Sequence, residues 1–326
     1  MLFRSDAEEV ERLRDEQLAT ILQRAKEPRA LANDMAAHFI FAEDVPYARP
    51  LIGTTASVQG LTPDDVQAFY RTHFLPNASS LLFVGDIDAG TARELADRHF
   101  GDWPAGQPVT AEFEVVPGIE TRTVFVVDRP GSVQSEIRIG DVGVARHHED
   151  YFPLLVMNTI LGGAFTSRLN MSLRERHGFT YGARSGFAFR RRPGPFIVQA
   201  AVATEVTARA VEEALKELES LRQDGATGEE VAAARDYLRG ILPLELQTTD
   251  QLASRLADLV VFELPDDYFQ QYRERIGAVS PEEVHRVARE HLRSDRLAVV
   301  VVGDAEKVAS DLESLDIGPV VTRQSD

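Results

Sequence analysis

Two stretches of this chain, separated by 218 positions, share one sequence pattern. The first reads LTPDDVQAFYRTHFLPNASSLLFVGD and ends at Asp86, and the second reads VSPEEVHRVAREHLRSDRLAVVVVGD and ends at Asp304. The two align without a gap, so that Pro63 matches Pro281. Self-similarity at a period of domain size indicates a duplicated domain and excludes a short-repeat solenoid. The chain is therefore expected to contain two copies of one fold.

The duplication also predicts the domain boundaries. Residues 120–326 form a complete second copy, and residues 1–103 form the C-terminal part of a first copy. Residues 104–119 form a linker, within a stretch rich in proline and glycine. Counting back from the second copy places the start of the first about a hundred residues before Met1. We expect the first copy to be incomplete and to expose apolar surface.

Each copy mixes helices and strands. Ser280 to Glu283 and Thr62 to Asp65 carry the capping signal of a helix N-terminus, with proline at the first helical position. Each helix leads into an apolar run that predicts a strand, at 79–84 and 297–302. In the second copy we predict further strands at 136–142, 186–189 and 196–202, and helices at 151–161, 167–176 and from 211 to 224. The fold class is α+β: two duplicated α/β domains, each with an antiparallel-rich sheet and helices on one face.

Composition excludes several classes of protein. The 52 acidic and 35 basic residues give a net charge of −17, which argues against nucleic-acid binding. No apolar run is long enough to cross a bilayer. The absence of cysteine excludes disulfides and thiolate zinc sites. It fits both the cytoplasm and the bacterial periplasm, so the compartment stays open.

Several common catalytic motifs are absent. The sequence contains no His-Glu-x-x-His or His-x-x-Glu-His zinc motif. It also contains no Gly-x-Ser-x-Gly nucleophile motif and no phosphate-binding loop. The only histidine cluster is His147-His148-Glu149-Asp150, at the start of a predicted helix. We interpret it as helix capping, because acidic side chains stabilise helix N-termini.

The stretch LGGAFTSRLNMSLRERHGFTY, from Leu161 to Tyr181, is the most distinctive in the chain. Here the chain resembles the insulinase/pitrilysin family of zinc metallopeptidases, in its bacterial branch similar to the mitochondrial processing peptidase. The matching residues of the second copy are Leu161-Gly162-Gly163, Ser167-Arg168-Leu169, Leu173-Arg174-Glu175, Gly178 and Tyr181. The first copy adds Pro46 to Pro50, Gly53-Thr54, Val84-Gly85-Asp86 and Phe100 to Trp103.

The resemblance implies a clamshell of two similar domains that closes over a peptide. In the family, an arginine and a tyrosine seven residues apart in the second domain bind the substrate backbone near the scissile carbonyl. These map onto Arg174 and Tyr181. A guanidinium and a phenol both donate hydrogen bonds, as stabilisation of a carbonyl oxygen requires. Spacing alone would favour a structural interpretation, with Arg174 at a helix C-terminus and Tyr181 as a strand aromatic.

The zinc ligands of the resemblance do not map onto this chain. The helix with the two histidines and the catalytic glutamate would lie before Met1. The third ligand, a glutamate in active members, maps onto Thr20, whose hydroxyl is a poor zinc ligand. We interpret Glu8, Glu9, Glu11 and Glu16 of the same helix as a solvated face.

Three hypotheses remain. In the first, the chain is a zinc-free, substrate-clamping subunit, forms a heterodimer with a zinc-bearing homologue, and binds peptide or unfolded polypeptide. In the second, it is a fragment of a complete zinc peptidase whose metal helix lies upstream. In the third, it is a non-catalytic structural or peptide-holding relative. The first two hypotheses expect no metal on this chain itself, with zinc in the partner or in an upstream segment.

Overall fold

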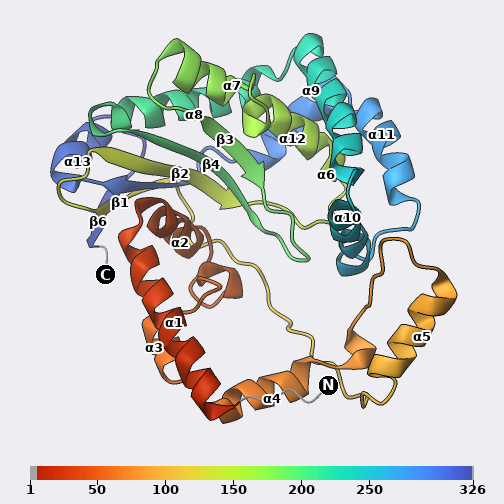
Figure 1. The fold of residues 1–326 in the computed structure, drawn as a ribbon. Coiled ribbons are helices and arrows are strands. Elements are labelled where there is room, and N and C mark those ends of the chain that lie inside the picture. Colours follow the sequence, from red (N-terminus) through yellow and green to blue (C-terminus); the bar gives the residue numbers. More distant parts are fainter. Residues whose placement is uncertain (1–5, 325–326) are drawn as a thin grey trace. The chain divides into compact units, whose positions relative to one another are not determined.

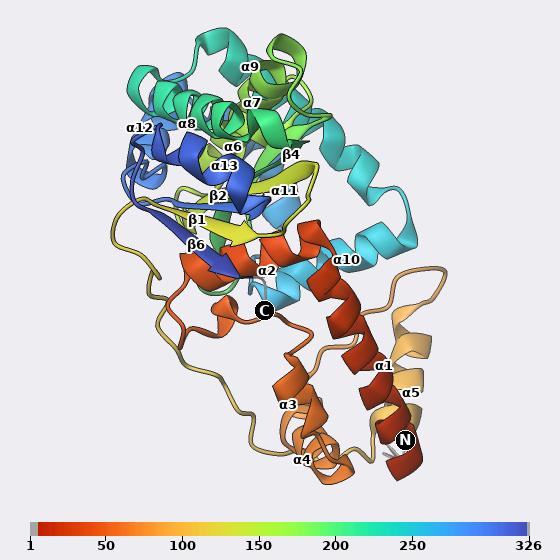
Figure 2. The ribbon, with the colours of Figure 1, turned by 90° about the vertical axis from the view of Figure 1, so that its left-hand side faces the viewer.

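The chain packs as two units. A computed structural model describes residues 6–324. The first unit contains the residues up to Arg24, together with Leu51–Phe113 and Leu242–Asp266. The second unit contains Ala25–Pro50, Glu114–Ile241 and the residues from Asp267 onward. Figures 1 and 2 show the ribbon from two sides. The predicted boundaries at 103 and 119 concern the duplicated sequence, and they stay a prediction.

A six-stranded mixed sheet forms the centre of the second unit, in the order β3-β4-β2-β5-β1-β6. The strands are β1 (Thr123–Asp128), β2 (Gln134–Val142), β3 (Ala183–Phe187), β4 (Pro195–Ala203), β5 (Ala298–Gly303) and β6 (Val320–Gln324). β5 pairs parallel with β1 and antiparallel with β2, and all of its residues are buried. A strand buried on both faces reads as a continuous apolar run, as AVVVVG does. The predicted α+β fold class, with an antiparallel-rich sheet, is confirmed.

Helices cover both faces of this sheet. Side chains alternate between the faces of a strand. In β2, the Ser135 hydroxyl accepts a hydrogen bond from Thr207 of one helical layer at 2.8 Å, whereas the Arg138 guanidinium donates to Asn33 of α2 (Pro28–Ile40) on the other face. Figure 1 shows α2 beneath the sheet, whereas α6, α8, α9 and α12 lie above or beside it. We predicted helices on one face only, and this was wrong because α2 comes from the first copy of the sequence.

The remaining helical elements of the second unit are as follows. They are η1 (Pro46–Ala48), α6 (Tyr151–Asn158), η3 (Thr159–Gly163), α7 (Arg168–Asn170), η4 (Met171–Arg176), η5 (Thr204–Val206), α8 (Thr207–Asp224), α9 (Gly228–Ile241), α11 (Tyr268–Ala278), α12 (Pro281–His291) and α13 (Ala305–Glu313). The predicted helices at 151–161 and 167–176 are present, but each changes to π-helical geometry before its end, in η3 and η4. Within the described residues, no helix is both long and apolar enough to span a bilayer.

The first unit is helical and has few buried side chains. Its elements are α1 (Ala7–Lys26, whose last two residues belong to the second unit), α3 (Thr55–Gln59), α4 (Pro63–His73), η2 (Pro76–Ala78), α5 (Ala89–Phe100), η6 (Leu242–Leu246) and α10 (Thr249–Val261). No residue of α4 or α5 is buried, and Phe69 and Phe74 are more than half exposed. The expected exposure of apolar surface in the first copy is confirmed.

The predicted strand at 79–84 is absent. Residues 79–84 form no ladder with any described segment, and Leu81, Leu82 and Phe83 are exposed. An extended segment becomes a strand only when a neighbour satisfies its backbone N–H and C=O groups. Residues 298–303 have such neighbours on both sides and form β5, so the same pattern has two outcomes in one chain.

The backbone of η3 approaches β3 closely at Gly162. A methyl group at its Cα would lie 2.3 Å from the Ser185 backbone nitrogen in β3. Asn158, one turn earlier, donates to the Ser185 carbonyl at 3.1 Å and accepts from the Ser185 hydroxyl at 2.7 Å. The glycine therefore allows η3 to lie directly on β3.

We predict that Gly162→Ala lowers the free energy of unfolding by about 2 kcal/mol or more, because overpacking against backbone forces η3 away from β3. Gly186→Ala in the same strand is the matched control, since a methyl group there meets no atom within 4 Å. Urea unfolding of both variants measures the difference. Equal stabilities would contradict the role given to Gly162.

Candidate functional site

The two residues predicted to bind substrate lie at the ends of one short segment of the second unit. Arg174 lies in η4, and Tyr181 lies in the loop that leads to β3. The Tyr181 side chain is almost fully exposed, at 95%. The Arg174 guanidinium lies 4.5 Å from the centre of the Phe165 ring and 3.4 Å from the Glu175 carboxylate. In the described structure no hydrogen bond joins Arg174 to Tyr181: the Tyr181 phenol is exposed, whereas the Arg174 side chain is partly buried between Phe165 and Glu175.

Asn170 forms hydrogen bonds to the chain before and after the segment that carries Arg174 and Tyr181. Its side-chain amide donates to the Phe165 carbonyl at 2.7 Å, and its carbonyl oxygen accepts from the Ala183 N–H at 3.2 Å. Asn170 is buried, so these bonds are shielded from water. Gly178 turns the chain between them with a φ of +65°. We did not predict Asn170 as a functional residue, although it directly follows the Ser-Arg-Leu motif.

Arg168, from the same motif, attaches the segment to α9. Its guanidinium donates to both oxygens of Glu230 at 2.7 and 2.8 Å, and to the Gly225 carbonyl at 2.9 Å. The hydrogen bond from Arg168 is the main cause that lowers the pKa of Glu230 to about 2. A bidentate pair of this kind fixes orientation as well as distance. The motif therefore anchors the segment that carries Arg174 and Tyr181 to α9.

Thr20 lies in α1 of the first unit, on an exposed part of the helix. Its hydroxyl donates to the Glu16 carbonyl at 2.9 Å, a local helix bond. The Glu16 carboxylate pairs with Arg12, which also binds Glu9. Neither an exposed hydroxyl nor a carboxylate held by arginine fits a zinc ligand. The acidic face of α1 is exposed, as predicted for Glu8, Glu9, Glu11 and Glu16.

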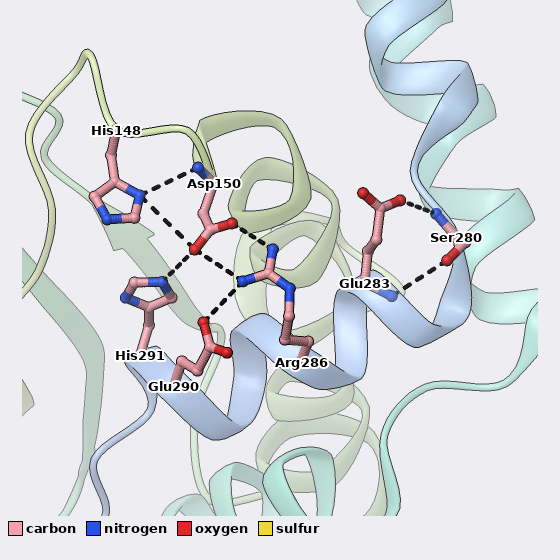
Figure 3. Close-up of polar contacts among 7 residues, drawn as sticks. All are labelled: His148, Asp150, Ser280, Glu283, Arg286, Glu290 and His291. Carbon is pink, nitrogen blue, oxygen red and sulfur yellow. Dashed lines mark hydrogen bonds and ion pairs between the residues drawn. The ribbon is translucent and has the colours of Figure 1, made fainter.

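The histidine cluster belongs to an ion-pair network that joins α6 to α12. Figure 3 shows Asp150 between His148, His291 and Arg286. His291 bonds one Asp150 oxygen at 2.8 Å, and Arg286 donates to both oxygens. Asp150 occupies the N-cap position of α6, but its side chain makes no cap bond. The predicted place at a helix N-terminus is confirmed, but the Asp150 side chain binds Arg286 and His291 of α12 and does not cap α6.

The same network contains atoms that metals bind. Ligand atoms of His148, Asp150 and His291 lie within 4.8 Å of one another. Arg286, however, places a permanent positive charge against both Asp150 oxygens, where a metal cation would have to bind. Burial alone would raise the pKa of Asp150, but the hydrogen bonds from Arg286 and His291 outweigh burial and hold it below its usual range. This arrangement fits an interhelical ion pair.

Comparison with known proteins agrees with the sequence motifs. The pattern described as the peptidase M16 inactive domain matches residues 60–238, more than half of the chain, and the chain belongs to this family. An uncharacterized zinc protease of Mycobacterium tuberculosis is 30% identical over 306 residues, which cover 92% of this chain and 68% of that protein. A probable mitochondrial-processing peptidase subunit beta of Schizosaccharomyces pombe is 25% identical, over 88% of this chain and 65% of that protein.

Solved structures support the fold. A crystal structure of a peptidase M16 inactive domain from Pseudomonas fluorescens superposes with a TM-score of 0.84 at 24% identity. The match covers 92% of this chain and 71% of that chain. The resemblance predicted from the motifs of residues 161–181 is confirmed.

We predict that Asp150→Asn lowers the free energy of unfolding at neutral pH by about 2 kcal/mol, because it removes charged hydrogen bonds to Arg286 and His291. The folded-state pKa of Asp150 is depressed, so its contribution is complete above the unfolded value of about 4 and is lost as the pH falls through the folded value. The difference between wild type and variant should therefore become smaller as the pH falls below about 4.

Urea unfolding at neutral pH and near pH ~3 measures this dependence. Asp311→Asn, on the exposed side of α13, is the control and should change little at either pH. A deficit in Asp150→Asn that persists unchanged in acid would contradict an ionic contribution.

Proposed function

We propose that this chain is the substrate-clamping, zinc-free subunit of a zinc metalloendopeptidase, and that a homologous zinc-bearing subunit completes it as a heterodimer. The observation that carries the proposal is a pair of donors, the exposed Tyr181 and the partly buried Arg174, on one segment that the Asn170 hydrogen bonds hold in place. The family supports a peptide as substrate, and the subunit named in the fission-yeast relative supports a partnered assembly.

The chemistry that this chain offers is hydrogen bonding to a peptide backbone. The Tyr181 phenol and the Arg174 guanidinium can each donate to a peptide carbonyl oxygen. Phe165 supports the Arg174 guanidinium from one side, which limits its rotamers, and the Glu175 carboxylate lies 3.4 Å from its Nε. Preorganised donors stabilise negative charge that develops on a carbonyl oxygen. Arg174 and Tyr181 would position the substrate, and the partner subunit would supply the groups that cleave it.

Zinc and the general base come from the partner in this proposal. The resemblance maps the third ligand onto Thr20, and the Thr20 hydroxyl donates to the Glu16 backbone carbonyl. A bound zinc ion supplies a nucleophilic water and polarises the carbonyl. The residues of this chain would orient the peptide, and the described region of the chain carries no step at the metal.

We predict that Arg174→Ala combined with Tyr181→Phe reduces peptide cleavage by the assembled pair about a hundredfold, because both donors to the substrate carbonyls are lost. Arg176→Ala and Tyr237→Phe are matched controls, since one lies on the same helical segment and the other is an exposed tyrosine of α9. The assay follows cleavage of a fluorogenic peptide by the chain copurified with its zinc-bearing homologue.

Zinc content of each purified subunit is measured in parallel. Zinc should be found in the purified homologue and not in this chain. Undiminished cleavage by the double variant would overturn the clamping role, and stoichiometric zinc on this chain alone would overturn the zinc-free assignment.

A further inference from the structure

A pocket lies beside Tyr181 on the face of the sheet that α2 partly covers. Its volume is about 320 Å³. It is lined by Arg29 at the start of α2, by the loop that carries Tyr181, and by polar residues of β2, β3 and β4. All of these residues belong to the second unit. The pocket therefore adjoins the site proposed to hold the substrate backbone.

Strand register explains why this pocket is polar. Gln199 of β4 pairs with Arg184 of β3 on one side and with Arg138 of β2 on the other. Residues paired across neighbouring strands point to the same face, so these three side chains form one row across the sheet. Glu136 lies two residues before Arg138 and shares its face. A row of polar residues along a face that a helix covers only in part leaves a recess that a ligand can enter.

The charges in the recess do not balance. Three arginines and one glutamate line it. Arg138 is 2% exposed, and its guanidinium binds the Glu136 carboxylate at 2.9 Å and Asn33 at 2.8 Å. Burial, aided by the nearby charge of Arg29, lowers the pKa of Arg138. The pocket thus holds one neutralised arginine and two further positive charges.

Arg29 and Arg184 are the groups left for a ligand. Both are exposed at the pocket wall. Across residues 6–324, neither guanidinium makes a hydrogen bond or an ion pair. The chain as a whole carries a net charge of −17. Unpaired arginines in one recess therefore form a local positive patch on an acidic protein. Guanidinium groups bind carboxylates with paired, parallel hydrogen bonds.

We propose that this pocket binds a carboxylate of the peptide held at Tyr181, through Arg29 and Arg184. The proposal rests on the proposed function, and it deepens it by naming the substrate class: peptides that carry an acidic group next to the clamped backbone. The carboxylate can belong to an aspartate or glutamate side chain or to the C-terminus of the peptide. Both sources present the same planar anion to the two guanidinium groups.

The test compares peptides that differ in one charge. Short fluorescent peptides of alanine, leucine and serine, blocked at both ends, carry either one central glutamate or glutamine in its place. A third peptide has the glutamine and a free C-terminal carboxylate. Binding to the full chain is measured by fluorescence anisotropy at low and at high salt. The glutamate peptide should bind about tenfold more tightly than its glutamine counterpart, and salt should reduce the difference.

Variants assign the preference to the pocket. Arg184→Gln and Arg29→Gln should each reduce the glutamate preference severalfold while the glutamine peptide binds as before. Arg323→Gln is the matched control, because it makes the same charge change in β6 at the opposite edge of the same sheet. A preference seen only with the free C-terminus would identify the terminal carboxylate as the ligand and would still support the pocket.

Two failures are distinguishable. Equal binding of all three peptides to the wild-type chain, with loss of binding in the Arg174→Ala, Tyr181→Phe variant, would overturn the carboxylate pocket and leave the clamp standing. If none of the three peptides binds, the clamp is overturned, and the pocket proposal with it. A preference that survives both Arg184→Gln and Arg29→Gln would also overturn the pocket.

Discussion

The contact of η3 with β3 determines where the candidate site lies. Gly162 lets the helix backbone approach the strand, and Asn158 bonds Ser185 on both its backbone and its side chain. β3 is an edge strand, held by β4 on only one side, so this contact supplies part of its support. The loop with Tyr181 enters β3, and the segment with Arg174 follows η3 along the chain. A shift at Gly162 would displace both.

Local sequence predicted where α4 and α12 begin, but it did not predict how much of each helix is buried. Thr62 and Ser280 both form capping boxes, as predicted, and each is followed by a proline and a helix of the same length. The helix of the second copy buries Val284, Val287 and Ala288, whereas the helix of the first copy buries nothing. A cap is decided by four adjacent residues, but burial is decided by neighbours from elsewhere in the chain.

The candidate site was predictable in part for the same reason. Arg174 and Tyr181 lie within one motif, so sequence alone could identify them. Arg29 is distant from them in sequence and reaches the pocket only because α2 packs on β2 and β5. The alternation of Gln134, Glu136 and Arg138 in β2 did carry a signal, since three polar residues on one face of a central strand indicate a face that is not part of the apolar core.

The position of α2 shows that the sequence repeat and the packed units of the chain have different boundaries. Residues 28–40 belong to the first copy by sequence, yet the Phe39 ring stacks on Phe125 of β1 at 3.8 Å and α2 covers the sheet of the second copy. A fragment that begins at the predicted linker would therefore lack α2, which covers one face of its sheet. A fragment that keeps α2 on the sheet must begin before Pro28. The two copies therefore cannot be separated at the boundary that the sequence repeat predicts.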